Sequence, residues 1–254
     1  MLPHPSVLYK YLNPLGAADF LKAPQLRFRD FRELDDLMEV LPGHRPLTEA
    51  EVQRDAEERH HWLKERGKVI SVEKCAIFVR ALSSLKGTTW EDGMRELLVD
   101  APGTLFICSL TERWNSGAMW GTYAERHGGI VFGISGAIDR VCQTRAYLAE
   151  VVYDEECPQM PSPVVDPGVM KQAIRTKSPD WSYQREWRLI SNSNTAERLS
   201  GPEVTEIVVG YRASKEIKAA AYAFREQGTA VFQAHPDPQR HSTARRELEA
   251  SDFK

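Results

Sequence analysis

Residues 119–134 read MWGTYAERHGGIVFGI, and this stretch carries the clearest structural signal in the chain. Its second half, 129–134, is a short run of β-branched and aromatic residues that begins beside a pair of glycines, which is typical of a half-buried strand. Its first half belongs to a helical pattern around 116–127. The stretch therefore predicts a short helix that leads directly into a strand.

Similar short runs rich in Val, Ile, Phe and Tyr lie on both sides of this stretch. They predict strands at 7–12, 25–28, 105–110, 147–153, 186–191, 204–210 and 229–234. Further helices are predicted at 166–177 and 214–227. Because the strands come in runs interrupted by a helical block, the pattern favours an α+β fold over a regular alternation of strands and helices. We expect a mixed or antiparallel core, either as one sheet or split into two.

The sequence predicts a single domain over residues 1–235, with a helical insertion at about 47–101. Thr48 and Glu51 form a capping-box pattern at the start of that block, and three helices are expected in it, ending near 65, 85 and 99. The remaining residues, 236–254, carry two prolines and many charges, so we expect a mobile tail.

The overall composition is that of a globular protein with a small net charge. Hydrophobic residues make up 42% of the 254 residues, and the net charge is −3. A nucleic-acid substrate would therefore have to be held by a local basic patch. The four cysteines are widely spaced, which indicates reduced thiols, and no stretch reaches the roughly 18 apolar residues of a membrane span. These features predict a cytoplasmic protein without a membrane partner.

The familiar motifs of phosphate loops, dinucleotide-binding turns, nucleophile elbows and zinc proteases are absent from the sequence. His60 and His61 fall on an exposed, charged helix with no third ligand nearby in sequence. We therefore predict no metal site.

Three aromatic residues of the opening stretch form the first candidate site. On a helix, Trp120, Tyr123 and His127 stand at i, i+3 and i+7 and share one face. Each of these rings carries a polar atom that needs a partner when buried, so the face suits stacking on a nucleobase or a nicotinamide. The alternative is an ordinary helix packed on the sheet.

The segment WSYQREWRLI, residues 181–190, is the second candidate. On a strand, Glu186 and Arg188 point to one side, whereas Trp187 and Leu189 point to the other. The charged side could face a cleft, where a carboxylate grips a sugar hydroxyl and an arginine holds a phosphate. The alternative is an exposed ion pair, worth about 0–1 kcal/mol.

The first strand holds LYKYL at 8–12. Tyr9 and Tyr11 share one face of this strand, and Lys10 lies on the other. Packing of the tyrosines and simple exposure of Lys10 are the default interpretation.

Several segments occur in the order of a bacterial family. LYKYL, FRDFRELDD, CSLTE, MWGTYAERHGGIVFGI, VVYDE, KSPDWSYQREWRLI and EIVVGY together resemble the domain of unknown function 2971 family, which is related to abortive-infection proteins. The resemblance covers roughly residues 8–211. It implies an antiviral-defence or toxin setting, but no particular reaction.

A more distant analogy concerns the reaction. A polar or aromatic first-strand residue, a central tyrosine and a late-strand glutamate are similar to the arrangement in ADP-ribosyltransferases, in which NAD lies between two small sheets. This analogy implies that Lys10 or Tyr11 contacts NAD and that Tyr123 stacks on its nicotinamide. It further implies that Glu186 stabilises the positive charge that develops as nicotinamide leaves.

Three functions follow as hypotheses. The first is an ADP-ribosyltransferase-like toxin or defence effector, using NAD against a nucleic acid or protein, with Trp120 in the stacking face and His127 and Arg188 contacting phosphate or target. The second is a non-enzymatic nucleotide- or nucleic-acid-sensing module of a defence system. The third is a metal-independent nuclease with His127 as base and Arg188 on phosphate. The first two imply an antitoxin or another defence protein as partner.

Overall fold

A computed structural model describes residues 5–34, 40–83, 105–162, 167–194, 196–199 and 203–253. The contacts of the chain divide it into two compact units. Unit 1 comprises Met1–Leu34, Gly103–Tyr153 and Ser178–Lys254, and unit 2 comprises Asp35–Pro102 and Asp154–Lys177. The expected insertion is therefore larger than a helical block, because a second stretch of chain, 154–177, completes it.

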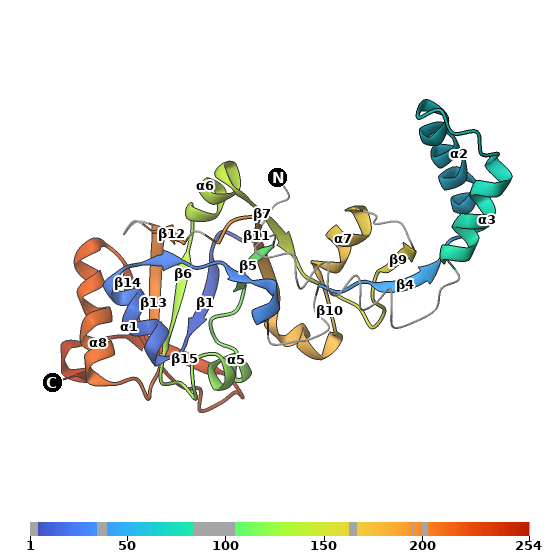
Figure 1. The fold of residues 1–254 in the computed structure, drawn as a ribbon. Helices are drawn as coiled ribbons and strands as arrows, with labels where there is room; N and C mark the ends of the chain where they lie inside the picture. The colour runs from blue at the N-terminus through green and yellow to red at the C-terminus, as the bar shows by residue number, and fades with distance from the viewer. Residues whose placement is uncertain are drawn as a thin grey trace. The chain divides into compact units, whose positions relative to one another are not determined.

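Unit 1 is built on one large mixed sheet (Figure 1). Its strands, in spatial order, are β15 (Thr243–Glu247), β14 (Ala230–Pro236), β13 (Val204–Val209), β6 (Ile130–Ile134), β1 (Leu8–Leu12), β5 (Phe106–Thr111), β11 (Glu186–Ser191) and β7 (Ala146–Glu150). The short strand β3 (Arg29–Asp30) also pairs with β5. All of these pairs are antiparallel except β13 with β14. This arrangement confirms the α+β class, with one continuous main sheet and not two halves.

Shorter elements of unit 1 connect these strands. The helices are α1 (Pro14–Lys22), α5 (Gly117–Thr122), α6 (Ala137–Thr144) and α8 (Lys215–Tyr222). The 3-10 turns are η1 (Phe31–Glu33), η2 (Pro179–Gln184), η4 (Ala223–Gln227) and η5 (Ala250–Asp252). The remaining strands are β2 (Gln25–Leu26), which pairs with β12 (Glu197–Arg198), and β8 (Val152–Tyr153).

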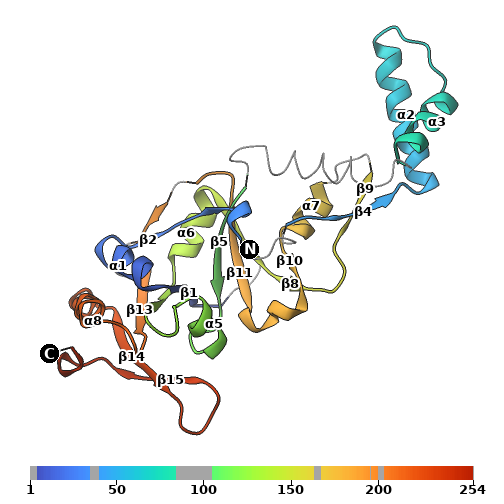
Figure 2. The same ribbon diagram turned by 60° about the horizontal axis from the view of Figure 1, so that its bottom comes forward.

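The two faces of the main sheet carry different side chains, because successive residues of a strand point to opposite sides. One face forms the larger hydrophobic core, in which Phe20 of α1 stacks on Phe132 of β6 with ring centroids 3.9 Å apart. Helices α1 and α8 lie side by side and contribute to this core (Figure 2). The opposite face is covered by α5 and carries a separate cluster of mostly aromatic residues.

Unit 2 contains the charged helices that the sequence predicts. Helix α2 (Glu49–Glu65) begins with the expected capping box between Thr48 and Glu51, and α3 (Val72–Ser83) packs against it. Strand β4 (Gly43–Pro46) pairs in parallel with β9 (Gln159–Ser162), and α7 (Pro167–Ala173) and β10 (Thr176–Lys177) complete the unit. The third expected helix, at 89–99, lies outside the described residues. Within the described part of the chain, no helix is long and apolar enough to cross a bilayer.

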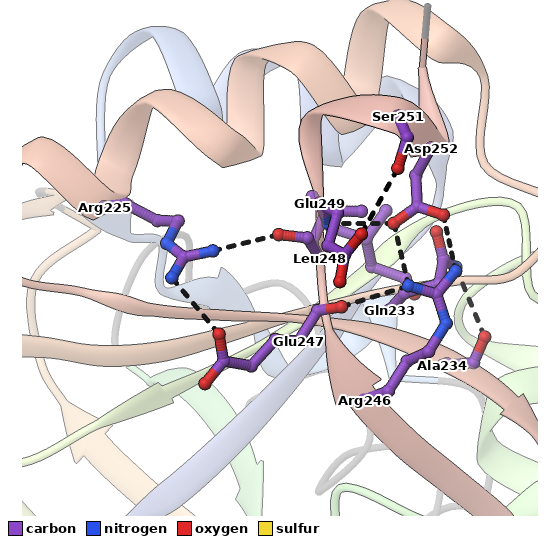
Figure 3. Close-up of polar contacts among 10 residues, drawn as sticks. Arg225, Gln233, Ala234, Arg246, Glu247, Leu248, Glu249, Ser251 and Asp252 are labelled. Atoms are coloured by element: carbon purple, nitrogen blue, oxygen red, sulfur yellow. Dashed lines mark hydrogen bonds and ion pairs between the residues drawn. The ribbon is translucent and has the colours of Figure 1, made fainter.

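The expectation of a mobile tail after residue 235 is wrong for its described residues. Strand β15 extends the main sheet by pairing with β14, and Arg246 binds both carboxylate oxygens of Asp252, at 2.9 and 2.5 Å. The backbone N–H of Glu249 donates to the same carboxylate at 2.8 Å (Figure 3). Arg225 also donates to the Leu248 carbonyl at 3.0 Å. Strand pairing and charge-assisted hydrogen bonds thus fix a segment whose composition resembles a solvated tail.

Candidate functional site

The second face of the main sheet is the candidate site, and we call it the aromatic face. Its members come from β1, β14, α5, the segments on either side of α5 and the 3-10 turn η2; they are Tyr9, Tyr11, Trp114, Trp120, Tyr123, Tyr183 and Phe232. Six of these seven side chains are Tyr or Trp, whose polar atoms require hydrogen-bond partners when buried. The face therefore combines ring surfaces with a network of polar contacts.

Helix α5, which carries Trp120, is shorter than predicted. Helix α5 ends at Thr122, and the next residues turn sharply, with positive φ angles of 46° at Glu125, 55° at Arg126 and 67° at His127. Non-glycine residues adopt this left-handed conformation at a cost, so surrounding contacts must hold it. One such contact is the hydrogen bond from the Arg212 N–H to the His127 carbonyl, at 3.1 Å. The predicted i, i+3, i+7 helical face is wrong because the helix has ended before His127.

Trp120 is sealed inside the aromatic face. Its side chain is fully buried, and its Nε1–H donates to the Trp114 carbonyl at 2.8 Å. The His127 ring stacks on it with an interplanar angle of 4°, and the Tyr11 ring meets it edge-on with centroids 5.5 Å apart. Trp120 therefore offers no free ring face to a ligand and acts as a packing residue.

His127 packs at the edge of the aromatic face, with its ring against Trp120. Its ring lies between Trp120 and Tyr211, whose ring centroid is 4.7 Å away. Burial lowers the pKa of the imidazole, and the nearby positive charge of Arg212 lowers it further. Its Nδ1 atom is buried without a hydrogen-bond partner. These features describe a neutral imidazole held in a strained turn.

The lowered pKa of His127 predicts a specific pH dependence of stability. Between the native pKa and the unfolded value of about 6.5, the unfolded chain binds more protons than the native one, so stability falls as the pH drops through this range. His127→Asn removes the titrating group and keeps a residue type that tolerates positive φ. We expect urea unfolding between pH 7.5 and 5 to show a smaller acid loss of stability for the variant. Parallel curves for the two proteins would contradict this assignment.

Tyr123 and Glu186 are connected through a short chain of contacts. The Gln184 side-chain amide donates to the Tyr123 hydroxyl at 2.7 Å. The Gln184 backbone carbonyl accepts from the Thr111 hydroxyl at 2.5 Å, and Thr111 is the direct cross-strand neighbour of Glu186. The fold thus brings the ring and the acid, 63 residues apart in sequence, to the same end of β11.

Glu186 and Arg188 form a buried ion pair. Arg188 is fully buried, and its Nε and Nη2 donate to the two Glu186 carboxylate oxygens at 2.9 and 3.3 Å. The Glu186 side chain is itself only 5% exposed. The predicted sharing of one side of the strand is confirmed, but the alternative of an exposed ion pair is wrong. Because the Arg188 guanidinium has no exposed surface, it is not accessible to a phosphate.

The first strand places its predicted residues on different faces of the sheet. Lys10 is the cross-strand neighbour of Phe132, on the side of the larger core, and its Nζ donates to the Ser109 carbonyl at 2.8 Å. Tyr11 lies on the aromatic face but is buried, and its hydroxyl accepts from the Ser116 N–H at 3.3 Å. Burial raises the pKa of the Tyr11 phenol. Lys10 is therefore on the wrong side of β1 to meet a ligand bound beside Tyr123.

Tyr9 is the first-strand residue that the sequence interpretation missed. It lies directly beside Thr111 across the β1–β5 pair, and it is half-buried. Its phenol forms a hydrogen bond with Glu206, and burial together with this contact raises its pKa. Glu206 also pairs with Arg245 at 2.8 Å, and the Arg245 guanidinium lies between the rings of Trp114 and Phe232, at 4.4 and 4.2 Å. Alternation along the first strand already indicated that Tyr9 and Tyr11 share a face, whereas Arg245 fell in the supposed tail.

The described residues include no group of three or more His, Cys, Asp or Glu side chains that could hold a metal ion. Comparison of the chain with protein-family models, curated proteins and solved structures finds no match. The resemblance to the domain of unknown function 2971 family therefore stays a prediction from the quoted segments.

Proposed function

We propose that this chain is an ADP-ribosyltransferase-like effector that transfers ADP-ribose from NAD to a nucleic-acid or protein target, in a toxin or antiviral-defence setting. The observation that supports this proposal is the contact chain from Tyr123 through Gln184 and Thr111 to Glu186. It links an aromatic ring to the strand that carries the carboxylate, and the chemistry needs both groups: a surface for nicotinamide and a negative charge near the ribose.

In the proposed reaction, the bond between the ribose C1′ and the nicotinamide nitrogen breaks, and neutral nicotinamide leaves with the bonding electron pair. A nucleophile of the target attacks C1′ and loses its proton to solvent. Positive charge builds up on the ribose as the bond breaks, and the Glu186 carboxylate stabilises that charge. The Glu186 side chain is almost completely buried, so the residues that cover it have to move when NAD binds.

Nicotinamide release tests the proposal. The protein is incubated with NAD and a cell extract, and free nicotinamide is measured for the wild type and for Glu186→Gln. We expect the variant to lose roughly 10²–10³-fold in rate, the loss associated with removing one group that stabilises transition-state charge. Glu197→Gln is a matched control, because Glu197 pairs with Arg140 and Arg145 outside the aromatic face. Equal release by wild type and Glu186→Gln, or none by either, would refute the proposal.

The second candidate function is a non-enzymatic nucleotide-sensing module. The observation that favours it is the burial of Glu186 in its ion pair with Arg188, which makes a purely structural role for both groups reasonable. Calorimetric titration with NAD and with ATP separates the two: binding that survives Glu186→Gln, without nicotinamide release by the wild type, supports the module. The nuclease alternative has no comparable support, since Arg188 has no exposed surface for a phosphate.

A further inference from the structure

Unit 2 exposes a group of large apolar side chains on its helical hairpin, α2 and α3. Among the residues that the structure describes, Trp62 is 53% exposed, Ile77 64%, Phe78 54% and Val69 99%. Single exposed apolar residues are ordinary, but a contiguous group of them marks an interaction surface. These four fall within one hairpin of 35 residues, 49–83.

Helix α3 is apolar on two opposite sides. Its inner side, with Cys75, Ala76 and Val79, packs in a small core with Val52 and Ala56 of α2. Its outer side carries Lys74, Ile77, Phe78 and Ala81, which stand at i, i+3, i+4 and i+7, and the large apolar residues among them are Ile77 and Phe78. A helix with apolar residues on both sides is expected to be covered on both. The inner side packs against α2, whereas Ile77 and Phe78 on the outer side remain more than half exposed.

Helix α2 extends the same surface. The guanidinium of Arg59 lies 5.8 Å from the centre of the Phe78 ring. Trp62 stands one turn further along the same side of α2, and the Arg66 guanidinium lies 4.0 Å from the centre of its ring. We call the surface formed by Trp62, Ile77 and Phe78 the hairpin face.

The charges of the hairpin identify the partner. Residues 49–58 contain five acidic residues and one basic residue, whereas 59–74 contain five basic and two acidic residues. Arg80 of α3 pairs with Glu49 at 2.7 Å and Arg45 pairs with Glu51 at 2.6 Å, and with both arginines counted that end of the hairpin stays net negative. One end of the hairpin is thus acidic and the other is basic. A two-fold axis that makes two hairpins antiparallel brings the acidic end of each copy against the basic end of the other.

We propose that the hairpin face binds a second copy of this chain, as an antiparallel, two-fold pair of hairpins that forms a four-helix arrangement. The hairpin face provides the buried centre of this interface, and the opposite charges at the two ends determine its direction.

Sedimentation equilibrium of the full chain tests this proposal. We expect the wild type at low salt to have twice the 28.8 kDa mass of one chain. Ile77→Glu with Phe78→Glu places charges in the centre of the interface and should weaken dimerisation by at least about tenfold. Leu15→Glu is the matched control, because Leu15 is an exposed apolar residue of α1 in unit 1 and should leave the dimer unchanged.

A charge exchange keeps the test independent of folding defects. Glu57→Lys with Glu58→Lys, or Lys64→Glu with Lys74→Glu, should each weaken the dimer, and the combination of all four substitutions should restore part of it, because the two ends then carry opposite charges again. A monomeric wild type at all concentrations up to about 100 μM would overturn the proposal, since that concentration corresponds to an affinity of only about −5.5 kcal/mol. Dimerisation that is unaffected by Ile77→Glu with Phe78→Glu, or combined charge variants that stay as weak as either pair, would overturn it as well.

Discussion

Replacing Arg188 with methionine is expected to lower the free energy of unfolding by about 3–5 kcal/mol, the usual cost of breaking a buried ion pair from one side. Arg188 is fully buried, and its guanidinium contacts both oxygens of Glu186, which is itself almost inaccessible to solvent. The substitution removes the positive partner and leaves a carboxylate in a position that water does not reach.

Urea unfolding of a double-mutant cycle measures this effect. Arg188→Met with Glu186→Leu replaces the whole pair by apolar side chains of similar size, and we expect the double variant to recover most of the loss, because such replacements are often nearly neutral. If the two single losses simply added, the two side chains would not be coupled, and the assignment of a buried pair would be wrong.

Truncating Trp120 is the second large change. We expect Trp120→Ala to cost about 3–5 kcal/mol, because it removes a fully buried indole that packs on Tyr11 and His127 and leaves the Trp114 carbonyl without its donor. The sequence interpretation assigned Trp120 to ligand stacking. Its complete burial instead predicts that Trp120→Ala lowers the stability of the fold.

Thermal unfolding distinguishes these two roles of Trp120. Trp181→Ala serves as the control, because Trp181 lies near the aromatic face and is only partly buried. We expect a much smaller decrease in melting temperature for Trp181→Ala. A Trp120→Ala protein as stable as the wild type, but unable to bind NAD, would restore the ligand-stacking assignment.

Most of the sheet was predictable because its strands are short apolar runs with local signals. The run at 186–191 was predicted with its observed ends, and those underlying β1, β5, β6 and β13 were within one residue at each end. Strand β15, by contrast, has the sequence TARRE, which carries no apolar run. It is held by pairing with β14 and by polar contacts such as that of Arg246 with Asp252. The hydrophobic periodicity of the sequence detects neither kind of interaction.

The candidate site was predictable only in part. The sequence selected Tyr123 and Glu186, and in the structure Tyr123 is hydrogen-bonded to Gln184, two residues before Glu186. The helical prediction failed for His127. The left-handed turn after α5 depends on contacts with residues near 210, which a local helical pattern does not include. The assignment of Lys10 failed as well, since Lys10 lies on the larger-core side of β1, away from Tyr11.

The central claim is that Tyr123 and Glu186 line one NAD-binding site. A crystal structure of the protein with NAD tests it most directly. We predict the nicotinamide ring against Tyr123 and a ribose hydroxyl about 2.7–3.0 Å from a Glu186 carboxylate oxygen, the distance of a charge-assisted hydrogen bond. NAD bound at a different surface, with the Glu186–Arg188 pair unchanged and closed, would contradict the account.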